Sequence, residues 1–256
     1  PGQFTRFAAN PEYFRGEPAV KEVVWRIFLN ADALGQALKK GEVDAATDLT
    51  PTVWSNLKDA PGITAVASAN TYFNHIAFNT GAALVDGTPI GDGNPAVRDA
   101  RVRRALSLAI DREAMTERLL QGLGTSGSTV IPPMYADLHL TPASGVEYDP
   151  ALAGQLLDEA GYPLGPDGVR VGSDGQPLTL RFFGRSDGDA DSAKILEYVQ
   201  AYFADVGVTL ESSLVSTDVI ITKYGEGKYD LYEWGWGVEP DPNYMLSAFT
   251  CANRSY

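Results

Sequence analysis

The feature that most restricts the fold is a regular alternation of helical and extended patterns over the second half of the chain. Helical patterns lie at residues 149–161, 190–207 and 218–225. Between the first two of them, residues 166–183 have the pattern of a hairpin that ends in a strand. Further extended patterns lie at residues 208–215 and 229–234. The first of these helices is the clearest, because Asp149 caps it, Pro150 stands at its first position and Gly161 ends it. Strands that alternate with helices predict an α/β fold.

The first part of the chain has a less regular pattern. Extended patterns at residues 3–10 and 21–30 precede short helical patterns at 31–41 and 49–57, and a further extended run covers 64–79. Gly, Pro, Asp and Asn are frequent at residues 80–97, which indicates a loop and a crossing between domains. At 256 residues the chain is long enough for one or two domains.

The charge balance excludes one class of partner. The chain has 33 Asp and Glu residues against 20 Lys and Arg, and acidic residues follow its main basic cluster at 98–104. Proteins that bind nucleic acids present Lys and Arg to phosphates, so nucleic acid is not an expected partner. No apolar run approaches the roughly 20 residues of a membrane-spanning helix. Cys251 is the single cysteine, which leaves neither a disulfide framework nor a cysteine-rich metal site.

Three patterns resemble cofactor or metal motifs, but a structural role without a ligand explains each of them better. Residues 122–127, GLGTSG, match the glycine pattern of dinucleotide-binding loops, but they follow a helix instead of opening one. Residues 187–198 begin like a calcium loop, yet its sixth and twelfth positions are Ser and Tyr instead of Gly and Glu. His75 and His139 are the two histidines, and a hydrogen-bonded structural role is preferred for His75. We therefore expect neither a cofactor nor a resident metal.

The stretch YEWGWGVEPDPNY, residues 232–244, combines tryptophans, glycines, prolines and carboxylates. Aromatic rings provide flat apolar walls, glycines allow a ligand to approach the backbone, and an acid can neutralise a cation. Glu239 and Asp241 could also serve as general acid and base, but acids two positions apart are common in solvated turns. The composition therefore favours a binding site over a purely structural turn, and both over catalysis.

Five motifs, in order, give the chain a resemblance to a known family. They are NPEYFRGEPAVKEVVWRI (residues 10–27), ALKKGEVDAA (37–46), DARVRRALSLAIDREAM (99–115), YDPALAGQLLDEAGYP (148–163) and GKYDLYEWGWGVEPDP (227–242). Together they resemble the large extracytoplasmic solute-binding proteins of ABC importers, in the dipeptide- and oligopeptide-binding family. The resemblance covers almost the whole chain.

The expected fold follows from this resemblance. It implies an α/β fold of the periplasmic-binding-protein-like type II class, with two lobes that close over a solute. Residues 1–77 would be a segment of the discontinuous first lobe, and residues 78–256 would be most of the second lobe. Family members carry further N-terminal and C-terminal stretches, so the chain is interpreted as a fragment, truncated within the second lobe.

The resemblance also implies ligand-binding residues. In peptide-binding members, an Asp three positions after the tryptophan of the G-W motif pairs with the α-amino group of the peptide. The matching tryptophan here is Trp236, and the acid is Glu239. Some members have an Arg three positions before that tryptophan, where this chain has Glu233. The contact that this Arg makes with the carboxylate of the peptide is therefore not expected here, and Glu239 and Glu233 together favour a cationic or amine-bearing ligand end near this wall.

Further candidates come from the neighbouring tryptophan and from another motif. Trp234 would add apolar wall beside Trp236. Tyr72 and Asn74 lie in TYFNHIAFN, which is similar to the crossing strand that lines the cleft in the family. The full set of expected ligand-binding residues is Trp236, Glu239, Trp234, Glu233, Tyr72 and Asn74.

The expected function is that of a solute receptor without catalysis. It would bind di- or oligopeptides between the lobes and present its closed form to a membrane permease. We expect an extracytoplasmic monomer, lipid-anchored in the full-length protein. A glycan, a nickel chelate or an opine is the alternative solute within the family. A hydrolase that uses Glu239 and Asp241 is the rival from another class, and the lack of a nucleophile–base constellation in the sequence opposes it.

Overall fold

The computed structural model describes residues 3–68, 71–142, 147–187 and 191–250. The chain divides into two compact units, Pro1–Ala67 and Ser68–Tyr256. This division falls before the boundary at residues 77 and 78 that the resemblance implies, and the loop at residues 80–97 lies inside the second unit. The assignment of the two units to two lobes stays a prediction.

The first unit is a β-hairpin followed by two short helices. Its elements are β1 (Phe4–Ala8), β2 (Glu22–Arg26), α1 (Ala31–Lys39) and α2 (Pro51–Leu57). The two strands are antiparallel, and every residue of both is exposed. The helices pack closely because α1 has Gly35 at the contact, where an added Cβ would lie 2.8 Å from Val53 Cγ1.

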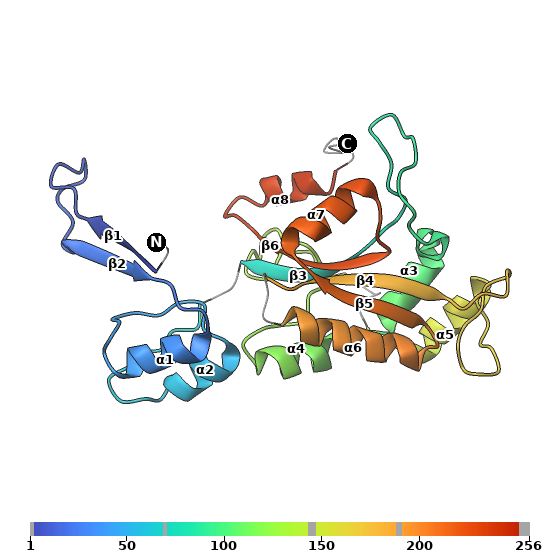
Figure 1. Ribbon diagram of the computed structural model, residues 1–256, viewed down its shortest axis with the longest axis horizontal. Helices are drawn as coiled ribbons and strands as arrows, with labels where there is room; N and C mark the ends of the chain where they lie inside the picture. The colour runs from blue at the N-terminus through green and yellow to red at the C-terminus, as the bar shows by residue number, and fades with distance from the viewer. Residues whose placement is uncertain (1–2, 69–70, 143–146, 188–190, 251–256) are drawn as a thin grey trace. The chain divides into compact units, whose positions relative to one another are not determined.

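The second unit contains a four-stranded sheet in the order β3–β6–β4–β5 (Figure 1). Its strands are β3 (Tyr72–Phe78), β4 (Thr179–Arg185), β5 (Thr209–Val215) and β6 (Leu231–Gly237). β4 pairs in parallel with both β5 and β6, whereas β3 pairs antiparallel with β6 along its whole length. The sheet therefore joins an early strand of the unit to three strands from the last part of the chain.

Helices cover both faces of this sheet (Figure 1). They are η1 (a 3-10 helix, Pro95–Arg98), α3 (Ala100–Leu108), α4 (Arg112–Leu120), α5 (Pro150–Glu159), α6 (Ser192–Asp205), α7 (Thr217–Glu226) and α8 (Asn243–Ala248). α6 packs on β4 and β5 and shares its apolar cluster with α3 and α5. α7 packs on the opposite face, where Ile220 belongs to a second cluster with Phe183.

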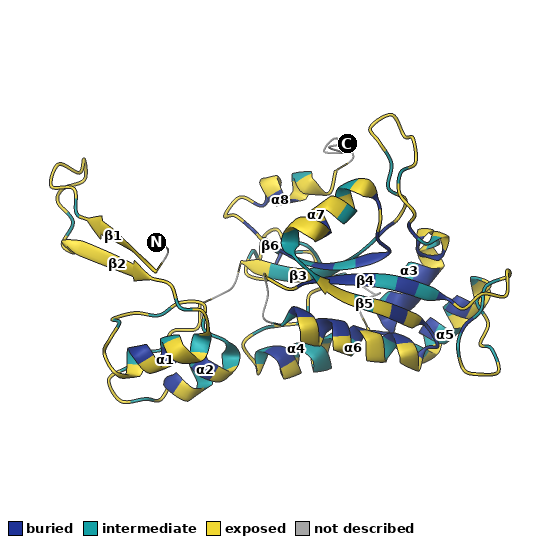
Figure 2. Cartoon of the chain, viewed as in Figure 1, coloured by how far each residue is buried: buried dark blue, intermediate teal, exposed yellow. Residues whose placement is uncertain are grey.

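The core follows from the alternation of side chains along β4. Leu180 and Phe182 belong to the main apolar cluster with α3, α5 and α6, and Phe183 belongs to the α7 side. Gly184 continues the first face, where an added Cβ would overlap the Leu196 side chain of α6. Figure 2 shows the buried residues on the central strands and on the helix surfaces that face them.

Local signals predict several helix boundaries correctly. The helix expected at residues 149–161 is α5, and Asp149 Oδ1 accepts a hydrogen bond from the Leu152 N–H at 2.9 Å. The GLGTSG sequence forms a loop after α4, with Gly122 at a φ of 80°. The sequence does not predict α8, because the prolines before it indicate only a turn.

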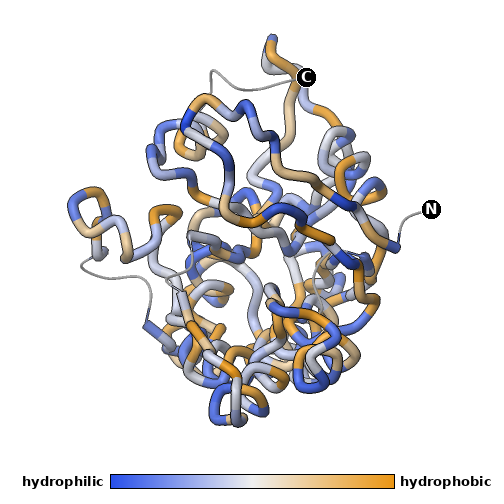
Figure 3. Tube along the Cα trace, turned by 90° about the vertical axis from the view of Figure 1, so that its left-hand side faces the viewer, coloured by the Kyte–Doolittle hydropathy of each residue, from blue (hydrophilic) through white to orange (hydrophobic). Residues whose placement is uncertain are grey.

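Two further features bear on membranes and metals. None of the described helices is long and apolar enough to cross a membrane, and Figure 3 shows short apolar stretches interrupted by polar ones. In the part of the chain that the structure describes, no three His, Cys, Asp or Glu side chains gather as they would around a metal ion. Residues 188–190 of the calcium-like sequence lie outside the described residues.

Candidate functional site

The pairing of β3 with β6 decides where the predicted ligand-binding residues point. Its register sets Tyr72, Asn74 and Ile76 opposite Gly237, Gly235 and Glu233, and sets Phe73 and His75 opposite Trp236 and Trp234. Opposed residues share one face of a sheet, and the faces alternate along each strand. Tyr72, Asn74 and Glu233 therefore share one face, while the two tryptophans lie on the other. The structure does not bring all six predicted residues together on one surface.

Glu233 lies in the interior, where its charge is compensated. Its side chain is 1% exposed and forms an ion pair with Arg185 of β4, with 2.9 Å between Arg185 Nη2 and Glu233 Oε1. The Ser192 hydroxyl, at the start of α6, donates a hydrogen bond to Glu233 Oε2. A buried carboxylate needs such partners because its removal from water is costly. Glu233 is therefore expected to act through Arg185 rather than on a solute.

Arg185 connects residues of β3 and β6 at the end of β4. Its guanidinium carbon lies 5.1 Å from the centre of the Trp234 ring, which is a cation–π distance. The same side chain hydrogen-bonds that of Tyr72. Burial opposes the charge of Arg185, but the contacts with Glu233 and Tyr72 outweigh burial and raise its pKa. One buried cation thus holds an acid, an indole ring and a phenol.

Tyr72 and Asn74 lie across the backbone of β6. A Cβ added at Gly235 would overlap the Tyr72 hydroxyl and the Asn74 side-chain oxygen. Glycine is therefore required at this position for the two side chains to keep their places. Both residues are exposed, so they present polar groups at the edge strand of the sheet.

Trp234 and Trp236 belong to an aromatic layer on the opposite face. Their ring centroids are 6.4 Å apart, and Phe249 lies 6.3 Å from the Trp236 ring and 6.2 Å from the His75 ring. Burial lowers the pKa of His75 to about 4, so its ring is neutral at pH 7. His75 Nε2 and Trp236 Nε1 are buried and have no hydrogen-bond partner among the described residues. The layer therefore combines apolar area with two unsatisfied polar atoms.

Glu239 stands just beyond β6 and is exposed. The residue before it is held from two sides: the Val238 N–H donates to Thr71 O at 2.8 Å, and the Tyr135 hydroxyl donates to Val238 O at 2.7 Å. Pro240 follows and restricts the backbone further. Among the described residues, no ion pair or hydrogen bond engages the Glu239 carboxylate. The acid is thus presented to solvent from a fixed stretch of backbone.

Asp241 has a local role in the turn after β6. Its Oδ1 accepts a hydrogen bond from the Asn243 N–H at 3.0 Å, at the first residue of α8. This contact stabilises the turn, which gives Asp241 a structural role of the kind common for acids in turns. The arrangement therefore supports ligand binding better than hydrolysis.

The sequence does not single out Arg185, Ser192 or Tyr135, each of which contacts a predicted site residue or its neighbour. Arg185 ends a strand that is otherwise largely apolar and buried, and a charge on such a strand is the signal that could have found it. Ser192 and Tyr135 offer no comparable signal, because their partners lie far along the chain.

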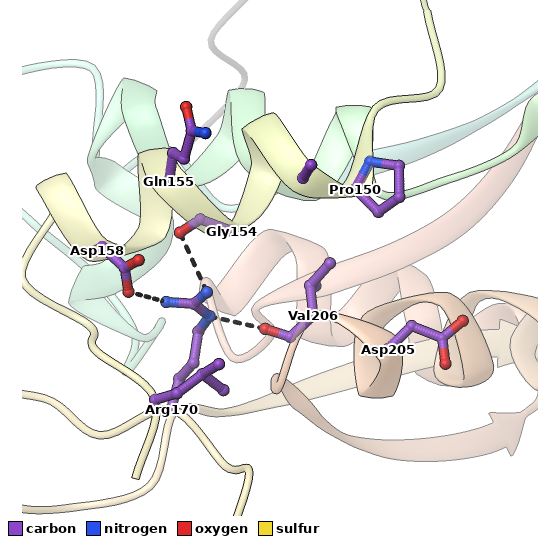
Figure 4. A pocket seen from close by; sticks show the side chains of 9 residues that line it. Pro150, Gly154, Gln155, Asp158, Arg170, Asp205 and Val206 are labelled. Atoms are coloured by element: carbon purple, nitrogen blue, oxygen red, sulfur yellow. Dashed lines mark hydrogen bonds and ion pairs between the residues drawn. The ribbon is translucent and has the colours of Figure 1, made fainter.

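A hollow of about 300 Å³ lies elsewhere in the second unit, between α5 and the end of α6 (Figure 4). Arg170 lines it, but this side chain is buried and donates to Gly154 O, Val206 O and the Asp158 carboxylate. None of the six predicted ligand-binding residues lines this hollow. Arg170 there joins secondary-structure elements, as its bonds to backbone carbonyls indicate.

Comparison with known proteins defines the class. A sequence model of the family described as bacterial extracellular solute-binding proteins, family 5 Middle, matches residues 1–256. The chain belongs to this family of solute-binding proteins.

Curated relatives bind different solutes according to their names. Di/tripeptide-binding protein 2 of Pseudomonas aeruginosa (strain UCBPP-PA14) is 26% identical over 253 residues, and the nickel-binding periplasmic protein of Escherichia coli (strain K12) is 25% identical over 256. These matches cover 97% and 96% of this chain but 43% and 45% of those proteins. The chain therefore spans less than half the length of these relatives.

Solved structures share the fold. Lactococcal OppA, complexed with an endogenous peptide in the closed conformation, matches with a TM-score of 0.78 at 20% identity, over 92% of this chain and 47% of that one. NikZ from Campylobacter jejuni, in complex with Ni(L-His), matches with a TM-score of 0.76 at 21% identity, over 99% of this chain and 48% of that one. The expected periplasmic-binding-protein-like α/β fold is confirmed, and the chain corresponds to about half of it.

Proposed function

We propose that this chain is part of the solute-binding receptor of a peptide-type ABC importer, and that it binds di- or oligopeptides without catalysis. Family membership and relatives named for peptide binding support this class of solute. The receptor would close over the peptide, and the membrane permease would recognise the closed form. The family description as extracellular supports a place outside the cytoplasm, where we expect a lipid-anchored monomer.

The observation that carries the proposal is the exposed carboxylate of Glu239. The contacts of Val238 with Thr71 and Tyr135 fix the backbone before it, so the acid is presented at a set position beside β6. A carboxylate there can pair with the α-amino group of a peptide. Hydrogen bonds to charged groups are worth about 1.5–3 kcal/mol, which is enough to favour a free amine over a blocked one.

The aromatic layer would supply the apolar part of the site. Trp234 and Trp236 would contact apolar side chains of the solute. Tyr72 and Asn74 are exposed on the other face of the sheet, and they would contact a part of the solute that extends past the edge strand β3.

The test is Glu239→Gln in the full-length protein, which removes the charge and nearly keeps the shape. We expect affinity for a peptide with a free amino terminus to fall about tenfold or more, and affinity for its N-acetylated form to change little. Isothermal titration calorimetry with both peptides measures this difference. Asp241→Asn is the matched control, because its carboxylate lies in the same turn and has a backbone partner. Unchanged affinity of Glu239→Gln for the free-amine peptide would overturn the assigned role.

Relatives named for other solutes define the alternatives. The nickel-binding periplasmic protein of Escherichia coli and heme-binding protein A of Haemophilus influenzae also match this chain. A nickel chelate, a glycan or an opine is the competing solute for this chain. Mass spectrometry of solute that co-purifies with the full-length protein distinguishes these cases. Turnover of a chromogenic substrate would instead support the hydrolase alternative and contradict a receptor role.

A further inference from the structure

Arg185 and Glu233 form a charged pair inside the second unit, next to the predicted ligand-binding residues. Their side chains are 9% and 1% exposed. Arg185 Nη2 donates to Glu233 Oε1 at 2.9 Å, and Arg185 Nε donates to Oε2 at 3.5 Å. The Ser192 hydroxyl donates to the same Oε2. Both carboxylate oxygens are therefore engaged by protein groups.

We propose that Arg185 and Glu233 are positioning residues, a charge-neutral pair that holds Trp234 and Tyr72 in place for solute binding. The inference rests on the proposed receptor function. Glu233 fixes the guanidinium of Arg185, which lies 5.1 Å from the Trp234 ring centre and hydrogen-bonds Tyr72. A guanidinium suits this task because its planar fork can bind a carboxylate along one edge while its face meets an aromatic ring.

The pair also determines the charge that a solute meets. Arg185 cancels the charge of Glu233, so this acid contributes little negative potential at the surface of β6. The sequence predicts that Glu233 and Glu239 together favour a cationic end of a solute, and the buried pairing with Arg185 disfavours a contribution from Glu233. A preference for amine-bearing solutes would then depend on the exposed acid, Glu239.

The first experiment separates positioning from direct recognition of charge. Glu233→Gln and Arg185→Met, in the full-length protein, are each titrated with a peptide that has a free amino terminus and with its N-acetylated form. We expect each variant to weaken binding of both peptides by the same factor, about tenfold, so that the affinity ratio is unchanged. Loss of affinity for the free-amine peptide alone in Glu233→Gln would show that Glu233 contacts the solute and would overturn the proposal.

The second experiment asks whether Arg185 acts through Trp234. In a Trp234→Leu background, we expect Arg185→Met to cause a smaller further loss of affinity than it causes in the wild type, because one of the two residues that it positions is already absent. In the solute-free protein, Arg185→Met is also expected to change the near-UV circular dichroism of tryptophan. Additive losses of affinity together with an unchanged tryptophan spectrum would refute the positioning role.

Thermal unfolding without solute keeps the test independent of the proposed function. Each single variant breaks the buried ion pair, so we expect its Tm to fall by about 5 °C or more, and the double variant to recover most of that loss. Glu226→Gln is the matched control, because Glu226 pairs with Lys228 at the surface at 2.9 Å, and its Tm should stay unchanged. If these Tm changes were found and the full-length protein bound no peptide, the proposed receptor function would be rejected and the stabilising role of the Arg185–Glu233 pair would stand. A double variant less stable than either single variant would reject the pair itself.

Discussion

At the scale of single residues, Glu233 and Glu239 show how two acids of one short motif come to have different environments. Glu233 points inward from a strand and meets Arg185, whereas Glu239 lies past the strand end and is exposed. Strand alternation predicts that Glu233 and Trp234 face opposite ways. It does not predict which acid is neutralised, because Arg185 lies 48 residues earlier in the chain.

His75 leads to a prediction about pH. Burial lowers its pKa from the ordinary 6.5 to about 4. The unfolded chain therefore takes up a proton near pH 6.5 that the folded protein takes up only near pH 4, and stability falls as pH decreases through this window. The part of this loss due to His75 is up to about 3 kcal/mol. His75→Phe is expected to lose less stability than the wild type between pH 7 and pH 4.5, measured by urea unfolding.

The other histidine provides the control for this measurement. His139 lies in a loop, where its Nδ1 is 2.6 Å from Ile131 O, so His139→Gln removes a histidine without touching the aromatic layer. An identical loss of stability between the two pH values in His75→Phe and in the wild type would contradict the account of His75.

At the scale of elements, Arg170 joins α5 to the end of α6. It donates to Gly154 O at 3.0 Å, to Tyr162 O at 2.6 Å and to Val206 O at 2.7 Å, as Figure 4 shows for the first and last of these. Arg170→Met would keep much of the apolar stem and leave buried carbonyls without this donor. We expect the free energy of unfolding to fall by about 3 kcal/mol, measured by chemical denaturation.

Arg101 is the matched control for Arg170. It donates to a carbonyl at the end of the same helix, Glu159 O, at 2.7 Å, but its side chain is 51% exposed. Arg101→Met is therefore expected to change stability little, because solvent replaces an exposed partner readily. An equal decrease in the free energy of unfolding for the two substitutions would show that the contribution of Arg170 to stability does not depend on its burial.

Elements with local signals are predictable from the sequence, and pairings between distant segments are not. Asp149 and Pro150 mark the start of α5 because capping depends on adjacent residues. The hairpin expected at 166–183 is present only as isolated bridges before β4, at Leu164–Arg170 and Val171–Pro177. Frequent glycines in this stretch turn the chain too often for a regular ladder. The pairing of β3 with β6 has no local signal at all.

At the scale of the whole molecule, the two units bury their strands to different extents. Both strands of the β1–β2 hairpin are exposed throughout, whereas β4 contains the fully buried Leu180 and Phe182. A two-stranded hairpin is marginally stable by itself. In the 256-residue chain, we expect amides of β1 and β2 to exchange with deuterium much faster than those of β4, measured by mass spectrometry. Equal protection of the two regions would contradict the description of the first unit.

The family and fold were predictable because five ordered motifs of the chain resemble those of known family members. The division of the chain was less predictable: it falls after Ala67, before the extended run that becomes β3. That strand belongs to the second unit because its partner is β6, a fact of tertiary structure. The motifs also do not identify the solute, because relatives named for peptide binding and for nickel binding both match nearly the whole chain.

The pairing of β3 with β6 has a consequence for how the protein is made. Asn79, directly after β3, donates to Tyr229 O, which lies 150 residues later in the chain. Ribosomes add about 5–20 residues per second, so β3 is synthesised roughly 8 to 30 seconds before its partner strand exists. During that interval its backbone donors and acceptors and its aromatic side chains are open to other chains and to chaperones. While about 150 further residues are added, this strand is therefore without the partner that it has in the folded structure.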